Sequence, residues 1–253
     1  MSGSQIHVNI DTNKDVKEAK KILKTVSCLL PFLPFLFSIF ILSSFAKEDS
    51  SLFTLLYVFA FISDCLKVYF ATQVPITNQS FIKIIWLSKH THDIILILAL
   101  WCTHLGPFIF TLSAFFVYLF QTLKGIKKNI APKLGEARDS IQDLCNSILN
   151  LKLLHQICAV LQVLLPFYLF FRGLFTLNGA CFICFFIVVF GYTLYALLSD
   201  PYHQEIYAQI KKLLKDNSSK IEGASKYVDQ FIDITSKIPD FARNLYPVPR
   251  KIV

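Results

Sequence analysis

The sequence LLHQICAVLQVLLPFYLFFRGLFTLNGACFICFFIVVFGYTLYALL, residues 153–198, decides the fold because it contains two apolar segments of bilayer length. Lys152 and Arg172 enclose nineteen residues without a formal charge. At about 1.5 Å per residue these cover roughly 28 Å, close to the thickness of the hydrocarbon core. After a turn at Asn178-Gly179, the run 180–198 covers about the same distance. Two such runs joined by an Asn-Gly turn predict a helical hairpin inside a membrane.

The composition of the whole chain is typical of a membrane protein. Of its 253 residues, 54% are hydrophobic and 17% are charged, and the mean hydropathy is +0.53. Soluble domains are about 45–50% apolar and about 25% charged. Because a backbone in lipid has to satisfy its own hydrogen bonds, the long uncharged runs predict helices. We therefore expect an all-α, polytopic helical membrane protein with cytosolic amphipathic helices. The uncharged runs are Thr25–Ala46, Ile94–Leu123, Leu153–Phe171 and Gly173–Ser199.

The net charge of +8 is concentrated outside these runs. Lys and Arg gather before residue 25, in the linker 124–138 and after residue 200. Basic residues beside spans mark the cytosolic side and favour anionic lipid headgroups. No basic run is interleaved with exposed stacking aromatics, so nucleic acid is not an expected partner. We expect a cytosolic segment at 1–24, a membrane domain at 25–198, and a cytosolic tail at 199–253, with both termini in the cytosol.

The expected spans are 25–46, 94–123, 153–172 and 180–198. The segment 52–70 is ambiguous, because its apolar first half is followed by Asp64 and Lys67. These two residues have the i, i+3 spacing that allows them to pair on one helix face. The segment is either a span with a buried ion pair or an amphipathic, partly inserted helix.

Cytosolic termini require an even number of passes, and two arrangements of the first half of the chain meet this condition. In the first, 25–46 crosses outward and 94–123 returns, which leaves 47–93 lumenal or interfacial. In the second, 52–70 returns to the cytosol and 94–123 is a re-entrant hairpin bent at Gly106-Pro107. Glycosylation of the acceptor sequon at Asn78 would support the first arrangement.

Three segments outside the spans have the apolar period of an amphipathic helix: 134–151, 202–215 and 221–238. In the second of these, an apolar stripe is opposed by three lysines. The stripe either packs in a helical bundle or lies in the membrane surface, with the lysines directed at lipid headgroups. The stripe consists of Tyr202, Ile206, Ile210, Leu213 and Leu214, and the lysines are Lys211, Lys212 and Lys215.

Motifs that would indicate a metal or a reaction are weak or absent. His90-Thr91-His92-Asp93 combines imidazoles with a carboxylate, but a helix directs residues i and i+2 to different faces, and no further ligand is near in sequence. Cys181 and Cys184 have zinc-site spacing but lie in mid-span without a partner pair. No Gly-rich phosphate loop, GxSxG or HExxH motif occurs. We therefore expect that the protein is not an enzyme and that it has no catalytic residue, no cofactor and no metal.

Polar side chains within the apolar runs define a second functional hypothesis, a small transporter or channel modulator. Polar groups inside a membrane are costly and are functional candidates by default. Hydrogen bonding between helices is the competing explanation for them. The residues concerned are His104, His155, Gln156 and Gln162.

The order of these features resembles the transmembrane-protein-33 family, to which a yeast pore-membrane protein belongs. Paired spans are followed by Ser199-Asp200-Pro201-Tyr202 and then by amphipathic helices. The middle is similar too, since Leu55–Phe70 precedes a short linker and His92-Asp93, which leads into a long apolar run ending at Lys124. The resemblance covers roughly residues 25–240. Asp-Pro-Tyr stands here where the family more often has Asn-Pro-Tyr after basic residues.

The resemblance implies a membrane protein of the endoplasmic reticulum and nuclear envelope. Members of the family are associated with reticulon-type tubule-shaping proteins and with nuclear pore distribution, and a tail helix of the yeast member is implicated in membrane association. We therefore expect a non-enzymatic membrane-shaping or scaffold protein. Its expected partners are the lipid bilayer and other membrane-shaping or nuclear pore proteins.

Overall fold

The computed structural model describes residues 12–45, 51–72, 85–86, 88–103, 108–218 and isolated positions up to 237. All regular elements in these ranges are helical, and they contain no strand. Five helical stretches are long and apolar enough to span a membrane. The prediction of an all-α polytopic membrane protein is confirmed. The five stretches are Glu18–Ser44, Ser51–Phe70, Phe108–Lys133, Lys152–Thr176 and Gly179–Ser199.

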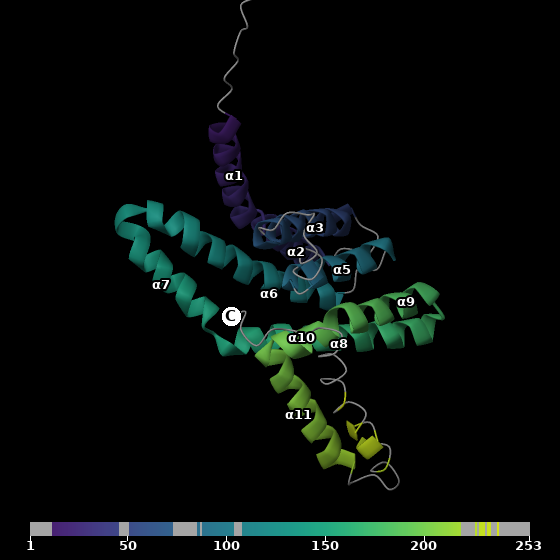
Figure 1. The fold of residues 1–253 in the computed structure, drawn as a ribbon. Coiled ribbons are helices and arrows are strands. Elements are labelled where there is room, and N and C mark those ends of the chain that lie inside the picture. The colour runs from purple at the N-terminus through teal and green to yellow at the C-terminus, as the bar shows by residue number, and fades with distance from the viewer. Residues whose placement is uncertain are drawn as a thin grey trace, which may run out of the picture.

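The predicted hairpin is present. Helix α8 (Lys152–Thr176) and helix α9 (Gly179–Val188) lie side by side, and a π-helical turn at Val189–Thr193 continues α9 into α10 (Leu194–Ser199) (Figure 1). Asn178 caps α9, because its side-chain oxygen accepts a hydrogen bond of 2.9 Å from the backbone N–H of Ala180.

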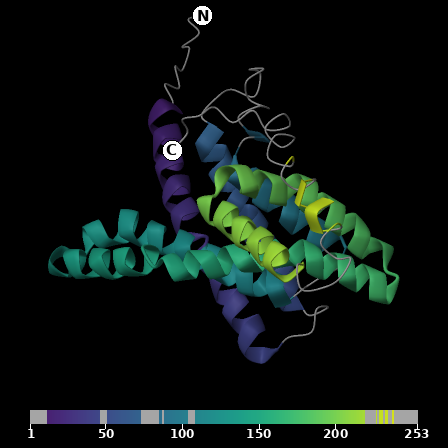
Figure 2. The same ribbon diagram turned by 90° about the horizontal axis from the view of Figure 1, so that it is seen from below.

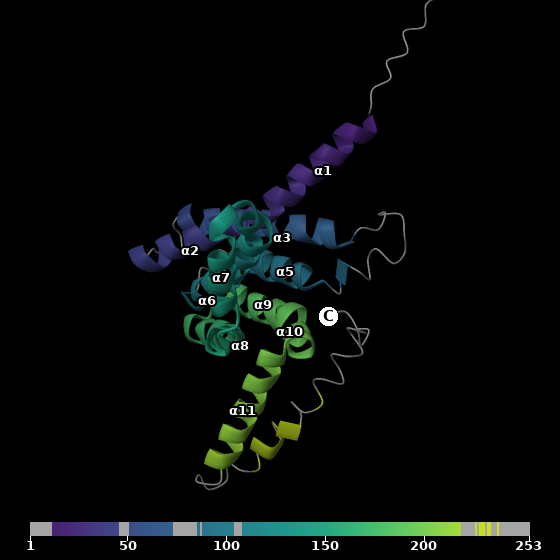
Figure 3. The same cartoon turned by 90° about the vertical axis from the view of Figure 1, so that its left-hand side faces the viewer.

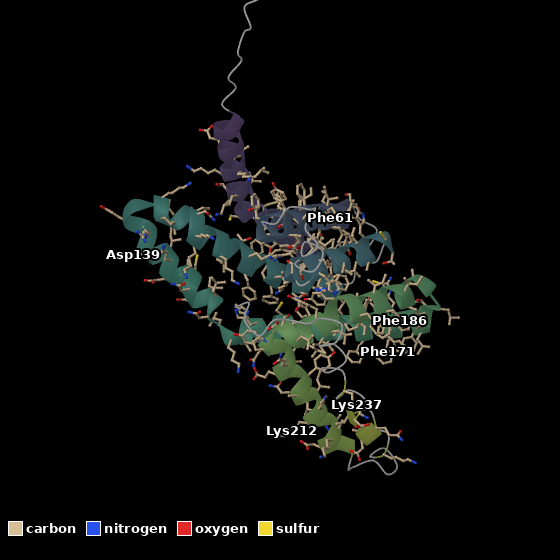
Figure 4. The ribbon with its side chains drawn as sticks, in the orientation of Figure 1. Phe61, Asp139, Phe171, Phe186, Lys212 and Lys237 are labelled. Atoms are coloured by element: carbon tan, nitrogen blue, oxygen red, sulfur yellow. The ribbon has the colours of Figure 1, made fainter. Side chains whose placement is uncertain are left out.

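Phenylalanines cover the outer surface of this hairpin. Phe171 and Phe186 are exposed on α8 and α9, where a bilayer would surround them (Figure 4). Large exposed side chains of this kind mark an interaction surface on a soluble protein and are ordinary on a lipid-facing one.

The first uncharged run is divided at Pro31. Helix α1 (Thr12–Leu29) joins the Lys-rich start of the chain to the beginning of the run, and α2 (Phe32–Ser44) forms the rest. The predicted span 25–46 falls almost entirely within the apolar stretch Glu18–Ser44, which is divided at Pro31 into α1 and α2. The cause is Pro31, which has no N–H to donate and whose ring clashes with the preceding helical turn. As a result α1 points away from the other helices (Figures 1 and 3).

The run 94–123 is not one helix. It forms α5 (Lys89–Cys102) and α6 (Phe108–Gly125). Asp64 of α3 (Ser51–Thr72) bonds both to His90, at the start of α5, and to Tyr118, in the second half of α6. The chain must therefore reverse direction between α5 and α6. The expected span 94–123 is corrected to two shorter helices.

The reversal matches the bend of the re-entrant alternative predicted for 94–123, but α6 belongs to the stretch Phe108–Lys133, which is itself long and apolar enough to span. Helix α3, the ambiguous segment 52–70, is long and apolar enough to span. With 14 residues, α5 measures about 21 Å, which is shorter than the hydrocarbon core. Residues 104–107, including Gly106-Pro107, lie outside the described part of the chain.

The linker after α6 turns into the predicted amphipathic helix. A π-helical turn at Ile126–Ile130 and two short 3₁₀ turns lead into α7 (Arg138–Leu149), which begins later than the expected 134. Gly135 has a φ of +53°, which suits glycine and interrupts the helix there. The end of α6 and α7 together extend away from the other helices (Figure 2). Asp139 lies on the outer side of this extension (Figure 4).

The main core lies between α2, α3, α5, α6 and the α8–α9 hairpin. Helix α2 packs on α3 and α6, α3 packs on α5, and α6 packs on α8. Two glycines permit the closest approaches. A Cβ on Gly125 would come within 2.2 Å of the Cys28 carbonyl oxygen, and one on Gly191 within 2.9 Å of the Ile95 side chain. The residues at the centre include Leu56, Ala60, Ile97, Leu100, Leu165 and Val188.

The first tail helix is confirmed as α11 (Pro201–Ser218). It projects from the helical body in the direction opposite to α1 (Figure 3). The second predicted tail helix, 221–238, lies mostly outside the described residues.

Candidate functional site

The start of α11 is fixed at its first turn. Pro201 is the first helical residue, and the Asp200 side chain accepts a hydrogen bond of 3.0 Å from the backbone N–H of Tyr202. The other carboxylate oxygen of Asp200 is 2.5 Å from Nδ1 of the buried His203. Partial burial alone would raise the pKa of Asp200, but the hydrogen bond and charge of His203 lower it below its usual value. The Asp-Pro-Tyr junction therefore sets the direction in which α11 leaves the hairpin.

The first half of the apolar stripe packs on α8. Ile206 is buried against Ala159 and Val163, and Tyr202 and Ile210 contact the same cluster. The ring of Tyr202 stacks on His155, with centroids 5.0 Å apart. This half of the stripe therefore packs on a helix of the membrane hairpin, and not on α7, the other amphipathic helix that the structure describes.

Polar contacts hold the same interface. Glu205 accepts hydrogen bonds from Lys152 at 3.1 Å and from Gln156 at 3.2 Å. The hydrogen bond from Lys152 lowers the pKa of Glu205. The Lys152–Glu205 ion pair is largely solvent-accessible, and exposed ion pairs contribute little to the free energy of folding. Its main effect is therefore to orient α11.

The second half of the stripe continues past α8. Leu213 lies on the same helix face as Ile206, yet its side chain is 60% exposed. Leu214 is partly buried. The apolar face of α11 is therefore covered as far as Ile210 and open at Leu213.

The three lysines lie away from this face. Lys212 and Lys215 are exposed and Lys211 is half-buried. Figure 4 shows Lys212 on the projecting part of α11, well separated from the hairpin. Among the described residues, no carboxylate lies within salt-bridge distance of Lys211 or Lys212. The predicted split into an apolar and a basic face is thus present in the folded helix.

The three described residues of the transport hypothesis are each held by a separate helix contact. His155 stacks between Phe120 and Tyr202 and bonds to the Leu149 carbonyl. Gln156 faces Glu205 at the α11 interface, whereas Gln162 is buried near Asp93 and Tyr192. His104 lies outside the described residues. Their contacts are those of helix–helix hydrogen bonding and stacking.

A second, buried polar site forms where α3, α5 and α6 meet. Asp64 is fully buried and accepts hydrogen bonds of 2.9 Å from the Tyr118 hydroxyl and, on its other oxygen, from His90 Nδ1. Lys67 lies 3.8 Å from Asp64 and donates to Gln121 of α6. Asp93 of α5 is 3.8 Å from His90. Sequence spacing predicted only the Asp64–Lys67 pair of this set.

His92 faces the opposite direction from His90, as the i, i+2 spacing predicted. Its Nδ1 bonds to the Gly191 carbonyl and its Nε2 to the Trp86 carbonyl at 2.7 Å. Its ring stacks on Tyr195 with centroids 3.9 Å apart. The π-helical turn at Val189–Thr193 presents the Gly191 carbonyl to this ring. His92 therefore attaches α5 to the α9–α10 helix.

No family model, curated protein or solved structure matches this chain.

Proposed function

We propose that the protein is a non-enzymatic membrane-shaping scaffold that acts through α11 and through helices of unequal length. The observation that carries this proposal is the divided apolar face of α11. Ile206 is buried against α8, a helix long and apolar enough to span a membrane, while Leu213 on the same face remains open.

Docking on α8 gives the open half of α11 a fixed position beside the bilayer. An apolar helix face at this position enters the headgroup layer, because that is where its exposed side chains leave water. The exposed Lys212 and Lys215 then face anionic headgroups, each contributing about 1 kcal/mol near such a surface. A helix inserted in this way adds area to one leaflet and favours curvature toward that leaflet.

The membrane helices contribute through their lengths. Helix α5 has 14 residues, so that it measures about 21 Å against a hydrocarbon core of about 30 Å. It packs on the longer α3. Short helices beside long ones give the protein a wider cross-section in one leaflet, which acts in the same sense as an inserted helix.

We place this activity at the endoplasmic reticulum and nuclear envelope, with both termini, α7 and α11 in the cytosol. The basic linker and tail support the cytosolic side. The similarity of the span order and of the Asp-Pro-Tyr junction to the transmembrane-protein-33 family supports the membrane and the partners. The partners we propose are reticulon-type proteins or nuclear pore components.

The test uses the full-length protein reconstituted into vesicles that contain anionic lipid, imaged by electron cryomicroscopy. We expect wild type to shift the vesicles toward smaller diameters and tubules. Leu213→Glu places a charge on the open apolar face and should remove most of the shift. Ala208→Glu introduces the same charge at an exposed position on the lysine side and should leave the shift intact.

Two outcomes would contradict the proposal. One is a vesicle size distribution with wild type that equals that of protein-free vesicles at the same lipid composition. The other is an equal effect of Leu213→Glu and Ala208→Glu, which would attribute the change to added charge alone.

A further inference from the structure

We propose that Asp64, His90 and Asp93 bind a divalent transition-metal ion, with zinc the best fit. Each of the three residues offers one ligand atom, and these atoms all lie within 4.8 Å of one another. Carboxylate oxygen and imidazole nitrogen are both zinc ligands, and catalytic zinc sites have three protein ligands and one open position. We name this set the α3–α5 triad.

The separations between the donor atoms suit a tetrahedral ion. Asp64 Oδ1 is 2.9 Å from His90 Nδ1, and His90 Nδ1 is 3.8 Å from Asp93 Oδ2. Two ligands at about 2.0–2.1 Å from a tetrahedral zinc ion are roughly 3.4 Å apart. The two observed distances lie on either side of this value, so that a shift of about half an ångström in each would bring both carboxylates to the tetrahedral separation from His90.

Asp93 supplies an independent observation. Its side chain is 9% exposed, and its Oδ2 atom has no hydrogen-bond donor among the described residues. A buried carboxylate oxygen without a partner costs at least about 1–3 kcal/mol. This atom faces His90 and the triad centre, where a cation would satisfy it.

A hydrogen bond from Tyr118 holds the Asp64 side chain in place. The Tyr118 hydroxyl donates to Asp64 Oδ2 over 2.9 Å, which leaves Oδ1 directed at the triad centre. Metal-binding carboxylates are commonly fixed by a second hydrogen bond of this kind. The His90 side chain is 27% exposed, so that the triad has a route by which an ion can enter.

Lys67 defines the competing arrangement. Its ammonium group is 3.8 Å from Asp64 Oδ1 and donates to Gln121. In this arrangement Lys67 offsets the charge of the Asp64 carboxylate without a metal. Under that arrangement added zinc would find no site, which makes the two cases distinguishable by experiment.

The experiment uses the full-length protein purified in detergent with a tag that contains no histidine. Bound metal is measured by inductively coupled plasma mass spectrometry, and affinity by titration of the metal-stripped protein with zinc. We expect about one zinc per chain. Asp93→Asn and His90→Gln keep the side-chain size and should each weaken binding by about 100-fold or more, and Tyr118→Phe by about 10–100-fold.

The matched control is His203→Gln, which alters the chain's other described His–Asp pair and should leave zinc binding unchanged. Replacement of zinc by cobalt should give d–d absorption bands in wild type and not in Asp93→Asn. Circular dichroism of each variant verifies that it is folded. Absence of bound metal together with absence of zinc binding in wild type would overturn the proposal, as would equal zinc affinity of wild type and folded Asp93→Asn.

Discussion

The ring of Tyr202 on α11 stacks on the ring of His155 on α8, with 5.0 Å between centroids and 7° between ring planes. Phe120 of α6 stacks on the same imidazole, at 4.2 Å. His155 therefore connects the projecting tail helix to the membrane core through two aromatic contacts. The position of α11 follows from this stack, from the Asp200 cap and from the burial of Ile206.

Ile206→Ala should release α11 from α8. Ile206 is 6% exposed, and truncation of a buried isoleucine to alanine typically costs about 2–5 kcal/mol. We expect faster amide hydrogen exchange along α11 in the full-length protein, measured by mass spectrometry. Leu213→Ala, at an exposed position of the same face, should leave exchange at the α8 contact unchanged. Equal protection of α11 in wild type and Ile206→Ala would refute the docking.

Gly125→Ala should destabilise the protein although alanine is the better helix former. In a helix interior this change normally gains about 1 kcal/mol. A Cβ at this position would be 2.2 Å from the Cys28 carbonyl oxygen, so that α1 and α6 must separate. Gly179→Ala, where a Cβ meets nothing within 4 Å, is the matched control. We expect a lower thermal unfolding midpoint in detergent for Gly125→Ala and an unchanged midpoint for Gly179→Ala.

The lowered pKa of Asp200 predicts that acid destabilises the start of α11. Its pKa is lowered in the folded protein, so that the charged carboxylate stabilises the fold fully above its unfolded value, about 3.9, and less as the pH falls through the folded pKa. Asp200→Asn retains an acceptor for the Tyr202 N–H but has no charge to lose. The thermal midpoints of wild type and Asp200→Asn should therefore begin to converge as the pH falls below about 4. A constant difference below this pH would assign no role to the charge.

The bond between Tyr118 and Asp64 predicts energetic coupling across helices α6 and α3. Tyr118→Phe leaves a fully buried carboxylate with one donor fewer, a loss of about 1–3 kcal/mol. A double-mutant cycle with Asp64→Asn, followed by chemical unfolding in mixed micelles, measures the coupling between the two side chains. Additive effects of the two substitutions would show that the bond contributes little.

The parts of the fold that depend on local pattern were predictable from the sequence. The length of α8, the turn at Asn178 and the period of α11 are all readable within one segment. The interruptions inside apolar runs were harder to place. Pro31 and the reversal between α5 and α6 change no charge, so that the charge pattern left 94–123 open between one span and a hairpin bent at Gly106-Pro107.

The candidate sites divide in the same way. The two faces of α11 follow from helical periodicity, and the structure adds only where the apolar face is covered. The α3–α5 triad joins Asp64 to His90 and Asp93 across more than one helix, a contact between residues 26 apart in sequence. Ligand spacing within His90-Thr91-His92-Asp93 could not reveal it, because the third ligand comes from another helix.

The most direct measurement of the central claim is the depth of residue 213 in the bilayer. A Leu213→Trp variant of the full-length protein is reconstituted into vesicles with lipids brominated near the headgroup, and the quenching of the two native tryptophans is subtracted using wild type. The account predicts strong quenching for Leu213→Trp and weak quenching for Ala208→Trp on the lysine side. Weak quenching at both positions would show that α11 stands in water, and would contradict the proposal that its open face enters the membrane.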